Sequence, residues 1–370
     1  MHKPLRVILS AGGTGGHIFP AIAIANYIKA KYPDSEILFI GAQGRMEMEK
    51  VPAAGYHIIG LPIAGYQRSW KKENLLLPFK VVTSLTKAIS VITRFKPDVV
   101  IGFGGYASGP VLYISSLLGK PTIIQEQNSY AGVTNKILAK RSKAICVAYE
   151  QMDKFFPKEK LQLTGNPVRK DLIQINSDKE EAAKYFGLFS NKKTILVIGG
   201  SLGSLTLNES AKNALTELKR SGTQMIWQTG KGYYQKAISA TSDCKDKVKV
   251  FDFLNRMDLA YTMADVVISR AGALSIAELA VLGKAAILVP SPNVAEDHQT
   301  KNAMALVHQG AALLVRDADA RQELFNTAMQ LLNNGAELDK LRMQIKTLAI
   351  CDADKRIVDV ALKNLKRELA

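Results

Sequence analysis

The sequence is poor in cysteine and has no long apolar run. Its three cysteines, Cys146, Cys244 and Cys351, lie far apart and form no pair motif. Neither a disulfide framework nor a zinc site is therefore expected, and a reducing cytoplasm suits such a chain. No window holds 18 uncharged apolar residues, which argues against a transmembrane helix. Because the N-terminus leads directly into an apolar run, no signal peptide is expected either.

Acidic residues are in deficit. The chain carries 49 Lys and Arg against 33 Asp and Glu, a formal net charge of +16. Residues 1–165 hold 21 of the bases and 10 of the acids, an excess of +11. This half is expected to meet an anionic partner, whether lipid headgroups, nucleic acid or a phosphorylated substrate. No RNA-binding or zinc-finger motif occurs, so nucleic acid is not the expected partner.

Two common nucleotide-binding motifs are also missing. The dinucleotide fingerprint G-x-G-x-x-G fails, because Ile18 stands at its last glycine position when counting from Gly13. No acidic residue follows the apolar run at residues 36–40 to bind a ribose hydroxyl, which disfavours NAD. No stretch matches G-x-x-x-x-G-K-S/T, which excludes the usual ATPase or kinase loop.

The N-terminal region does contain a glycine-rich loop, Gly12-Gly13-Thr14-Gly15-Gly16-His17. A β-prone run at residues 5–9 precedes it, and apolar residues at helical spacing follow it at 20–29. Free N–H groups at a helix start attract anions, and glycines let an anion approach them closely. Phosphate or pyrophosphate is the expected ligand, and a tight turn without a ligand is the alternative.

A second strand, glycine loop and helix begin at Thr194, with the loop at residues 199–204. Alternating strands and helices around both loops predict parallel sheets, and hence an α/β protein with two Rossmann-like domains. Gly and Pro interrupt the pattern near residues 164–169, which sets the expected domains at 1–165 and 166–353. Two such domains facing each other would close a cleft between their glycine loops.

Several short motifs occur in a fixed order along nearly the whole chain. They are Gly12-Gly13-Thr14-Gly15-Gly16-His17, Gly104-Gly105-Tyr106-Ala107-Ser108-Gly109-Pro110, Glu126-Gln127-Asn128, Gly165-Asn166-Pro167-Val168-Arg169, Gly199-Gly200-Ser201, Arg270-Ala271-Gly272-Ala273-Leu274, Glu278 and His298-Gln299. Together they resemble the GT-B glycosyltransferases of family 28, and within them the MurG family of bacterial peptidoglycan enzymes. The resemblance implies an inverting hexosyltransferase that moves N-acetylglucosamine from UDP-N-acetylglucosamine to the muramyl 4-hydroxyl of lipid I, making lipid II. It also implies that a helix at about 354–370 packs back on the first domain.

Three positions depart from the family pattern. Gln125 stands where many relatives have histidine, and Leu202 and Ser204 replace the usual Gln and Ala of the second glycine loop. These departures concern fine contacts and leave the implied reaction unchanged.

His17 is the candidate catalytic base. In the first turn of a helix the dipole disfavours imidazolium, which leaves a neutral ring able to accept a proton. Two alternatives stay open, a hydrogen-bond donor to the acceptor's pyrophosphate and a capping or packing histidine. The resemblance further implies that Gly104, Gly105, Tyr106 and Glu126 hold the acceptor.

The resemblance places the UDP-sugar in the second domain. Arg169 and Ser201 would neutralise its diphosphate, and Glu278 would accept both ribose hydroxyl hydrogens. Leu254 would flank uracil in the family register, whereas its residue type alone favours core packing. The other donor-binding residues implied are Thr14, Gly15, Gly16, Asn128, Ala273, Leu274, Ser275 and Gln299, although the first glycine loop as a whole is expected to face the acceptor's pyrophosphate.

No metal or other cofactor is expected. Metal-dependent sugar transferases often carry an Asp-x-Asp pair, and two such triplets occur, at residues 317–319 and 352–354. Both are expected to be solvated surface acids away from the glycine loops.

A segment at residues 63–95 mixes large apolar side chains with bases. Lys80, Lys87 and Arg94 recur every seven positions, which places them on one helix face. The residues expected to dock on an anionic bilayer are Trp70, Lys71, Lys72, Leu76, Phe79 and Lys80. A buried helix with a solvated basic stripe is the alternative. The expected location is the cytoplasmic face of the inner (plasma) membrane, peripherally bound, with cell-division or elongation proteins as further candidate partners.

Two other enzyme classes compete with this interpretation. UDP-N-acetylglucosamine 2-epimerases are isomerases of the same architecture, but they need no lipid acceptor and no apolar-basic segment. Lipid glycosyltransferases that use diacylglycerol are closer rivals.

Overall fold

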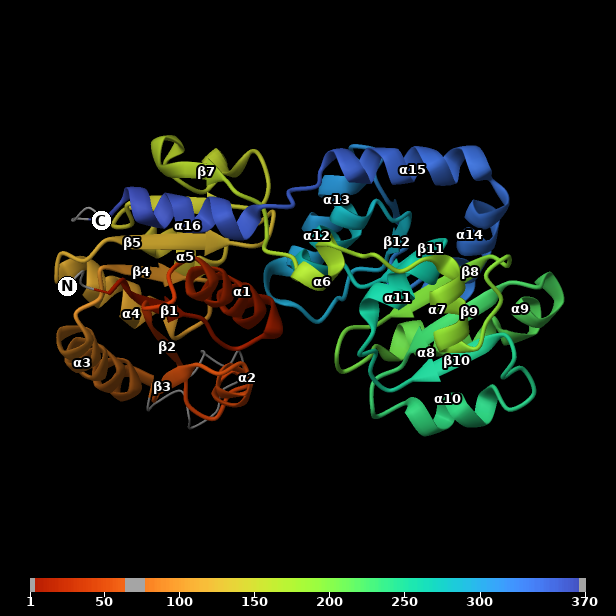
Figure 1. Ribbon diagram of the computed structural model, residues 1–370, viewed down its shortest axis with the longest axis horizontal. Coiled ribbons are helices and arrows are strands. Elements are labelled where there is room, and N and C mark those ends of the chain that lie inside the picture. The colour runs from red at the N-terminus through yellow and green to blue at the C-terminus, as the bar shows by residue number, and fades with distance from the viewer. Residues whose placement is uncertain (1–3, 64–76, 366–370) are drawn as a thin grey trace. The chain divides into compact units, whose positions relative to one another are not determined.

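The computed structural model describes residues 4–63 and 77–365, which fold into two compact units (Figure 1). The first unit comprises residues 1–167 and 352–370, and the second comprises residues 168–351. Each unit is built on one parallel sheet with helices packed against it. The predicted α/β class with two Rossmann-like units is thereby confirmed.

The first unit contains a seven-stranded sheet of order β3-β2-β1-β4-β5-β6-β7. Its strands are β1 (Arg6–Ser10), β2 (Glu36–Ala42), β3 (His57–Leu61), β4 (Val99–Gly102), β5 (Thr122–Glu126), β6 (Ala144–Val147) and β7 (Leu161–Leu163). Its helices are α1 (Gly15–Lys31), α2 (Glu47–Ala53), α3 (Leu77–Phe95), α4 (Ser108–Leu117), α5 (Val133–Leu138) and α16 (Ala353–Lys363). The order reverses at β1 and β4, which are neighbours in the sheet, and the glycine-rich loops leave their carboxyl ends.

Strand β1 shows why these short apolar runs become central strands. Ile8 pairs in register with Leu38 and with Val100, so β1 has a parallel neighbour on each side. Val7 packs into the core beneath α1, whereas Ile8 packs into the opposite core beneath α3 and α4. Successive side chains of a strand point to opposite faces, so a strand covered by helices on both faces must be apolar throughout.

Helix α16 belongs to the first unit although it follows the whole second unit in the chain. Its buried Ile357 and Val358 join the core that contains Ile24 of α1. Asp359 lies 3.7 Å from Lys31 at the end of α1, and Figure 1 shows the two helices in the same part of the first unit.

The second unit contains a six-stranded sheet of order β10-β9-β8-β11-β12-β13. Its strands are β8 (Thr194–Ile198), β9 (Gln224–Gln228), β10 (Val248–Phe251), β11 (Val266–Ser269), β12 (Ala286–Leu288) and β13 (Leu313–Leu314). Its helices are α6 (Lys170–Ile173), α7 (Lys179–Phe186), α8 (Leu205–Asn213), α9 (Leu215–Ser221), α10 (Tyr234–Ala240), α11 (Met257–Met263), α12 (Ala273–Leu282), α13 (His298–Val307), α14 (Ala320–Asn333) and α15 (Gly335–Thr347).

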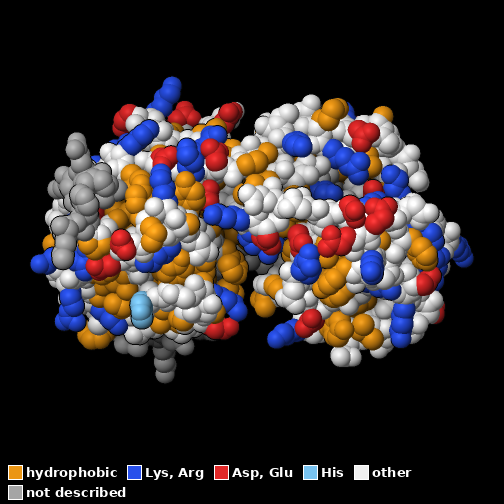
Figure 2. Space-filling view, in the orientation of Figure 1, with side chains coloured by type: hydrophobic (Ala, Val, Ile, Leu, Met, Phe, Trp, Pro, Cys, Tyr) orange, Lys and Arg blue, Asp and Glu red, His pale blue; other side chains and the backbone are white. Residues whose placement is uncertain are grey.

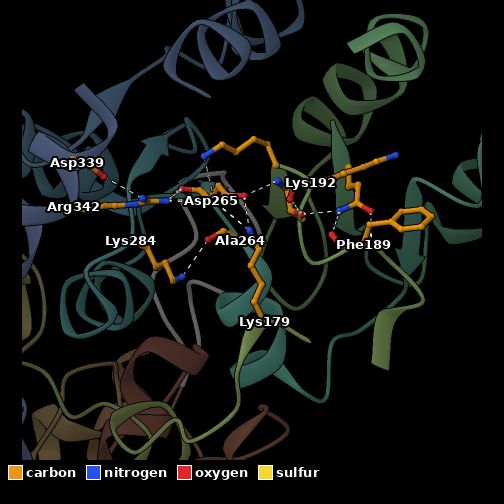
Figure 3. A network of polar contacts seen from close by, with 11 residues as sticks. Lys179, Phe189, Lys192, Ala264, Asp265, Lys284, Asp339 and Arg342 are labelled. Atoms are coloured by element: carbon orange, nitrogen blue, oxygen red, sulfur yellow. Dashed lines mark hydrogen bonds and ion pairs between the residues drawn. The ribbon is translucent and has the colours of Figure 1, made fainter. Parts of the chain in front are cut away.

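A charged cluster around Asp265 ties together the starts of β8 and β11 (Figure 3). Its Oδ2 accepts the backbone N–H of Thr194 at 2.9 Å and the amine of Lys179 at 3.2 Å. Arg342 of α15 lies 3.6 Å from Oδ1. Lys284 donates to the backbone carbonyl oxygen of Ala264, the residue before Asp265. Burial lowers the pKa of Lys284 to about 8, and the charge of Arg342 contributes to this shift. The cluster around Asp265 therefore contains more basic than acidic side chains. It lies at the amino ends of β8 and β11, whereas the second glycine loop follows the carboxyl end of β8.

Candidate functional site

His17 is held by the glycine loop from which it emerges. Thr14 is the extended residue before α1, and His17 lies in the first turn of that helix. The ring atom Nδ1 lies 2.9 Å from the carbonyl oxygen of Gly12. Because a carbonyl can only accept, Nδ1 carries the hydrogen in this bond. In the neutral ring, Nε2 is then the unprotonated nitrogen, which is the form that a general base requires.

A second glycine turn packs directly against this loop. Gly104 and Gly105 have φ angles of +92° and +82°, which favour glycine. A Cβ on Gly104 would lie 3.2 Å from Nε2 of His17, and a Cβ on Gly105 would collide with the carbonyl oxygen of Gly12. The Ser108 hydroxyl, which donates to the Gly104 carbonyl oxygen at 2.8 Å, fixes the turn at the start of α4. The two loops therefore meet around His17, and Tyr106 beside them is half exposed.

Glu126, at the end of β5, organises the third loop of this region. Its buried carboxylate accepts hydrogen bonds from the N–H of Asn128 at 3.1 Å, the N–H of Gly132 at 3.0 Å and the side-chain amide of Asn135 at 2.8 Å. The carboxylate thus holds the loop at residues 128–132 and the start of α5 in place. Its predicted contact with the acceptor stays a prediction. Sequence reasoning missed Asn135, whose buried Oδ1 has no hydrogen-bond partner among the described residues.

The departure at Gln125 has a clear structural setting. Gln125 is fully buried in β5, and its side-chain amide donates to Oδ1 of Asn166 at 2.9 Å. Asn166 in turn donates to the backbone carbonyl oxygen of Gln127 at 3.0 Å. An amide fits this network because it donates and accepts at once. Gln125 therefore connects β5 to the segment around Asn166, just before the chain leaves the first unit at residue 167.

In the second unit, the structure brings together two predicted donor-binding residues. Glu278 lies on α12, and its Oε1 is 3.5 Å from Nε of Arg169. Its other oxygen accepts the hydroxyl hydrogen of Tyr261 at 3.0 Å. Burial raises the pKa of Glu278, and the charge of Arg169 and the hydroxyl of Tyr261 oppose that shift. Tyr261 was not predicted, because a tyrosine in an apolar helical stretch gives no sign of a polar partner.

The other predicted donor residues have more varied positions. Ser201 is exposed in the second glycine loop, and Leu202 beside it is 86% exposed. Gln299 uses its side-chain oxygen to accept the N–H of Ser291 at 2.9 Å. Leu254 is buried, as its residue type alone predicted. Ala273, Leu274 and Ser275 are the first residues of α12, at the helix end whose dipole favours an anion.

The expectation of a solvated surface acid away from the glycine loops was wrong for Asp317, whereas Asp319 pairs with the exposed Arg316 at the surface. Asp317 lies 2.6 Å from Arg270, and it accepts the hydroxyl hydrogen of Thr206 at 3.1 Å. The same arginine donates to the hydroxyl of Ser204, which ends the second glycine loop. Asp317 therefore helps to support this loop, because Arg270, 47 residues away in sequence, brings the two together. Within residues 4–63 and 77–365, no group of three or more His, Cys, Asp or Glu side chains is arranged to hold a metal.

The predicted membrane-docking residues are only partly described. Phe79 and Val82 on α3 are 72% and 58% exposed. Lys80 is partly exposed, while Lys87 donates to the carbonyl oxygen of Gly60 at 2.8 Å and so is not part of a free basic stripe. Figure 2 shows basic and hydrophobic side chains together on the surface of the first unit. Trp70, Lys71, Lys72 and Leu76 lie outside the described residues.

Comparison with known proteins places both halves of the chain in one family. Residues 7–147 match the glycosyltransferase family 28 N-terminal domain, and residues 194–357 match the family's C-terminal domain. A protein of Parabacteroides distasonis is 53% identical over 99% of this chain and 100% of its own length. A protein of Cytophaga hutchinsonii is 55% identical over 96% of each chain. Both are named UDP-N-acetylglucosamine–N-acetylmuramyl-(pentapeptide) pyrophosphoryl-undecaprenol N-acetylglucosamine transferase.

Solved structures give a consistent result. The crystal structure of Acinetobacter baumannii MurG matches with a TM-score of 0.79 and 30% identity, over 97% of this chain and all of that one. The UDP-GlcNAc 2-epimerase of Neisseria meningitidis matches with a TM-score of 0.68 at 15% identity, over 97% of this chain and all of that one. At that identity the epimerase shares only the fold with this chain, and the similarity gives no information on the reaction that this chain catalyses.

Proposed function

The chain belongs to glycosyltransferase family 28, and from this membership we propose that it transfers N-acetylglucosamine from UDP-N-acetylglucosamine to lipid I, undecaprenyl-pyrophosphoryl-muramyl-pentapeptide. The observation that carries this conclusion is more than 50% identity, over nearly the full chain, to relatives named for that transfer. The protein is thus a hexosyltransferase of peptidoglycan biosynthesis, and its product is lipid II.

His17 is the base in this mechanism. The muramyl 4-hydroxyl loses its proton to Nε2 while its oxygen forms the new bond to C1 of the donor sugar. The bond between C1 and the UDP oxygen breaks at the same time, and its electron pair leaves with the diphosphate. Donation from Nδ1 to Gly12 supports this role, because it leaves Nε2 as the acceptor. A side chain at position 104 would crowd Nε2, because even a Cβ there would lie 3.2 Å from that atom.

The second unit binds the donor in this proposal. Glu278 accepts the ribose hydroxyl hydrogens, with its carboxylate oriented by Tyr261. Arg169, Ser201 and the first N–H groups of α12 meet the charge that develops on the departing diphosphate. These groups supply positive charge and hydrogen bonds where a metal ion would otherwise be needed, so the transfer is proposed to proceed without a metal cofactor.

Peripheral attachment to the membrane completes the proposal. None of the helices in the described part of the chain combines the length and the apolar character that crossing a bilayer requires. The exposed Phe79 and Val82 of α3, with Lys80 beside them, support shallow docking on an anionic surface at the cytoplasmic face. Docking there would bring the first unit to a substrate whose undecaprenyl chain lies in the bilayer. Division and elongation proteins stay predicted partners.

The decisive experiment is a transfer assay with purified protein, radiolabelled UDP-N-acetylglucosamine and a short-chain lipid I analogue. Labelled sugar on the lipid, with an equal amount of UDP, is the expected result. Replacing His17 with Ala should lower turnover about 100-fold or more while the protein stays folded. Formation of N-acetylmannosamine without lipid product would favour the epimerase alternative, and transfer to diacylglycerol instead of lipid I would favour the other lipid glycosyltransferases.

A further inference from the structure

Glu47, the first residue of α2, lies fully buried beneath the first glycine loop. Both of its carboxylate oxygens are used. Oε1 accepts the N–H of Ala42 at 2.9 Å, and Oε2 accepts the N–H of Gly13 at 3.1 Å. A carboxylate is rarely buried completely, because its dehydration is costly unless partners replace the water. The two hydrogen bonds to the Glu47 carboxylate therefore replace the water that it loses on burial.

Two glycines make room for this side chain. A Cβ on Gly12 would collide with Oε1 of Glu47, and a Cβ on Gly41 would collide with its Cγ. Gly12 comes from the loop after β1 and Gly41 from the end of β2. The carboxylate thus lies between two backbone segments, and each segment comes so close to it that only glycine fits at these two positions.

The bond to Gly13 leads directly to His17. The N–H of Gly13 and the carbonyl of Gly12 belong to the same peptide group. Glu47 accepts at the nitrogen end of that group, and Nδ1 of His17 donates at its oxygen end. Because a peptide group is planar, fixing its N–H also fixes the direction of its C=O. A carboxylate at the N–H further polarises the group and makes its oxygen a better acceptor.

We propose that Glu47 is a positioning residue that sets the tautomer and orientation of His17 through the Gly12–Gly13 peptide group. Its effect resembles that of a carboxylate bonded directly to a catalytic histidine, except that a peptide group transmits it. The inference rests on the proposed function, in which Nε2 of His17 takes the proton. It assigns to Glu47 no contact with either substrate.

The test compares the wild-type protein with Glu47→Gln, which preserves shape but can no longer accept hydrogen bonds at both side-chain positions. The protein is labelled with 15N-histidine, and the His17 signals are assigned by their loss in His17→Asn. In the wild type, the nitrogen shifts should show a protonated Nδ1 and an unprotonated Nε2. In Glu47→Gln they should move toward a mixture of tautomers. The turnover number with lipid I analogue should fall about 10- to 100-fold, while the KM for UDP-N-acetylglucosamine changes less than about twofold.

Two further variants separate positioning from folding. Glu47→Asp keeps the charge and should recover part of the turnover and of the Nδ1–H population. Glu49→Gln lies on the same helix with an exposed side chain that pairs with Lys50, and should behave as wild type. His17 nitrogen shifts that are identical in wild type, Glu47→Gln and Glu47→Asp would overturn the proposal, even if turnover falls. If the wild type transfers no sugar, the proposed function fails, while the nitrogen shifts still decide whether Glu47 controls the ring.

Discussion

The hydroxyl of Tyr261 donates a 3.0 Å hydrogen bond to Oε2 of Glu278, and Nε of Arg169 lies 3.5 Å from Oε1. Tyr261 is itself buried, so its hydroxyl has a fixed direction. The two contacts approach the carboxylate at different oxygens and hold its plane in one orientation. In the proposed function this carboxylate accepts hydrogen bonds from two neighbouring ribose hydroxyl groups, and a fixed orientation before the ligand arrives favours such binding.

Replacing Tyr261 with Phe removes this orienting bond and little else. We expect the KM for UDP-N-acetylglucosamine to rise roughly fivefold to tenfold, equivalent to about 1 kcal/mol, with the turnover number within about twofold. Initial-rate kinetics with varied donor would measure both. Tyr233→Phe is the matched control, because it removes a similar bond, of 2.9 Å, to Glu209 elsewhere in the same unit. Equal KM values for the two variants would contradict the role of Tyr261.

Replacing Gly105 with Ala should disturb the contact between the two glycine turns. The residue has φ +82°, and the new Cβ would collide with the carbonyl oxygen of Gly12. We expect turnover to fall at least tenfold and the free energy of unfolding to fall by about 2 to 4 kcal/mol. Gly44→Ala is the control, since Gly44 has φ +67° but open space around its Cβ position. It should cost only about 1 kcal/mol and leave turnover unchanged, as denaturation and rate measurements would reveal.

Lys284 predicts a dependence of stability on pH. Burial lowers its pKa from 10.5 to about 8. Below pH 8 both the folded and unfolded chains hold the proton, and the folded state bears the full cost of a buried charge. Between pH 8 and 10.5 the unfolded chain binds the proton and the folded chain does not, so this cost disappears as the pH rises.

Lys284→Met should therefore raise the free energy of unfolding at pH 7 by about 2 kcal/mol, after allowing for the lost hydrogen bond. The gain should shrink toward pH 10, which denaturant titrations at the two pH values would test. Lys340→Met, at an exposed position on α15, should change the free energy by less than about 0.5 kcal/mol at either pH. A gain that grows with pH would show that the sign is wrong.

The exposed face of α3 predicts vesicle binding by the first unit. Changing Phe79 and Val82 together to Ser should weaken binding to vesicles rich in anionic lipid roughly tenfold or more, because two apolar side chains no longer enter the bilayer. Sedimentation of the protein with vesicles at low and high salt would measure this. The control changes Tyr185 and Phe189, which are similarly exposed in the second unit, to Ser. Equal losses in both double variants would indicate nonspecific adsorption.

Chelation tests the proposal of metal-free transfer. Turnover should be unchanged, within about 20%, after exhaustive treatment with EDTA, because in the proposed mechanism the basic groups and helix N–H groups of the second unit supply the positive charge. Loss of activity with chelator, followed by recovery with a divalent ion, would contradict the proposal of metal-free transfer.

Replacing Asp317 with Ala should lower the free energy of unfolding by about 3 kcal/mol, because it leaves Arg270 without its carboxylate partner.

The fold was more predictable than the contacts of the site. Apolar runs such as residues 5–9 and 195–198 predicted the central strands, because a strand buried on both faces has to be apolar throughout. The glycine loops were equally visible, since few other residues allow such turns. In contrast, Asn135 and Tyr261 were missed, because nothing in their neighbouring residues indicates a partner brought near by folding.

Asp317 and Glu47 illustrate the same difficulty. Asp317 has the local sequence of a surface acid, and only Arg270, from the end of another strand, makes it a support of the second glycine loop. Glu47 lies 34 residues from Gly13, and its sequence neighbours give no sign of this contact. Local patterns predict elements, whereas hydrogen bonds between distant side chains depend on the three-dimensional arrangement.

The placement of α16 has a consequence for how the protein folds during its synthesis. A ribosome makes the chain in order, so residues 353–363 emerge only after the entire second unit. Until then, the face of α1 that α16 contacts in the finished molecule has no such cover. A nascent chain halted after residue 167 would expose this surface and invite chaperones or aggregation. The half that is synthesised first is therefore completed last.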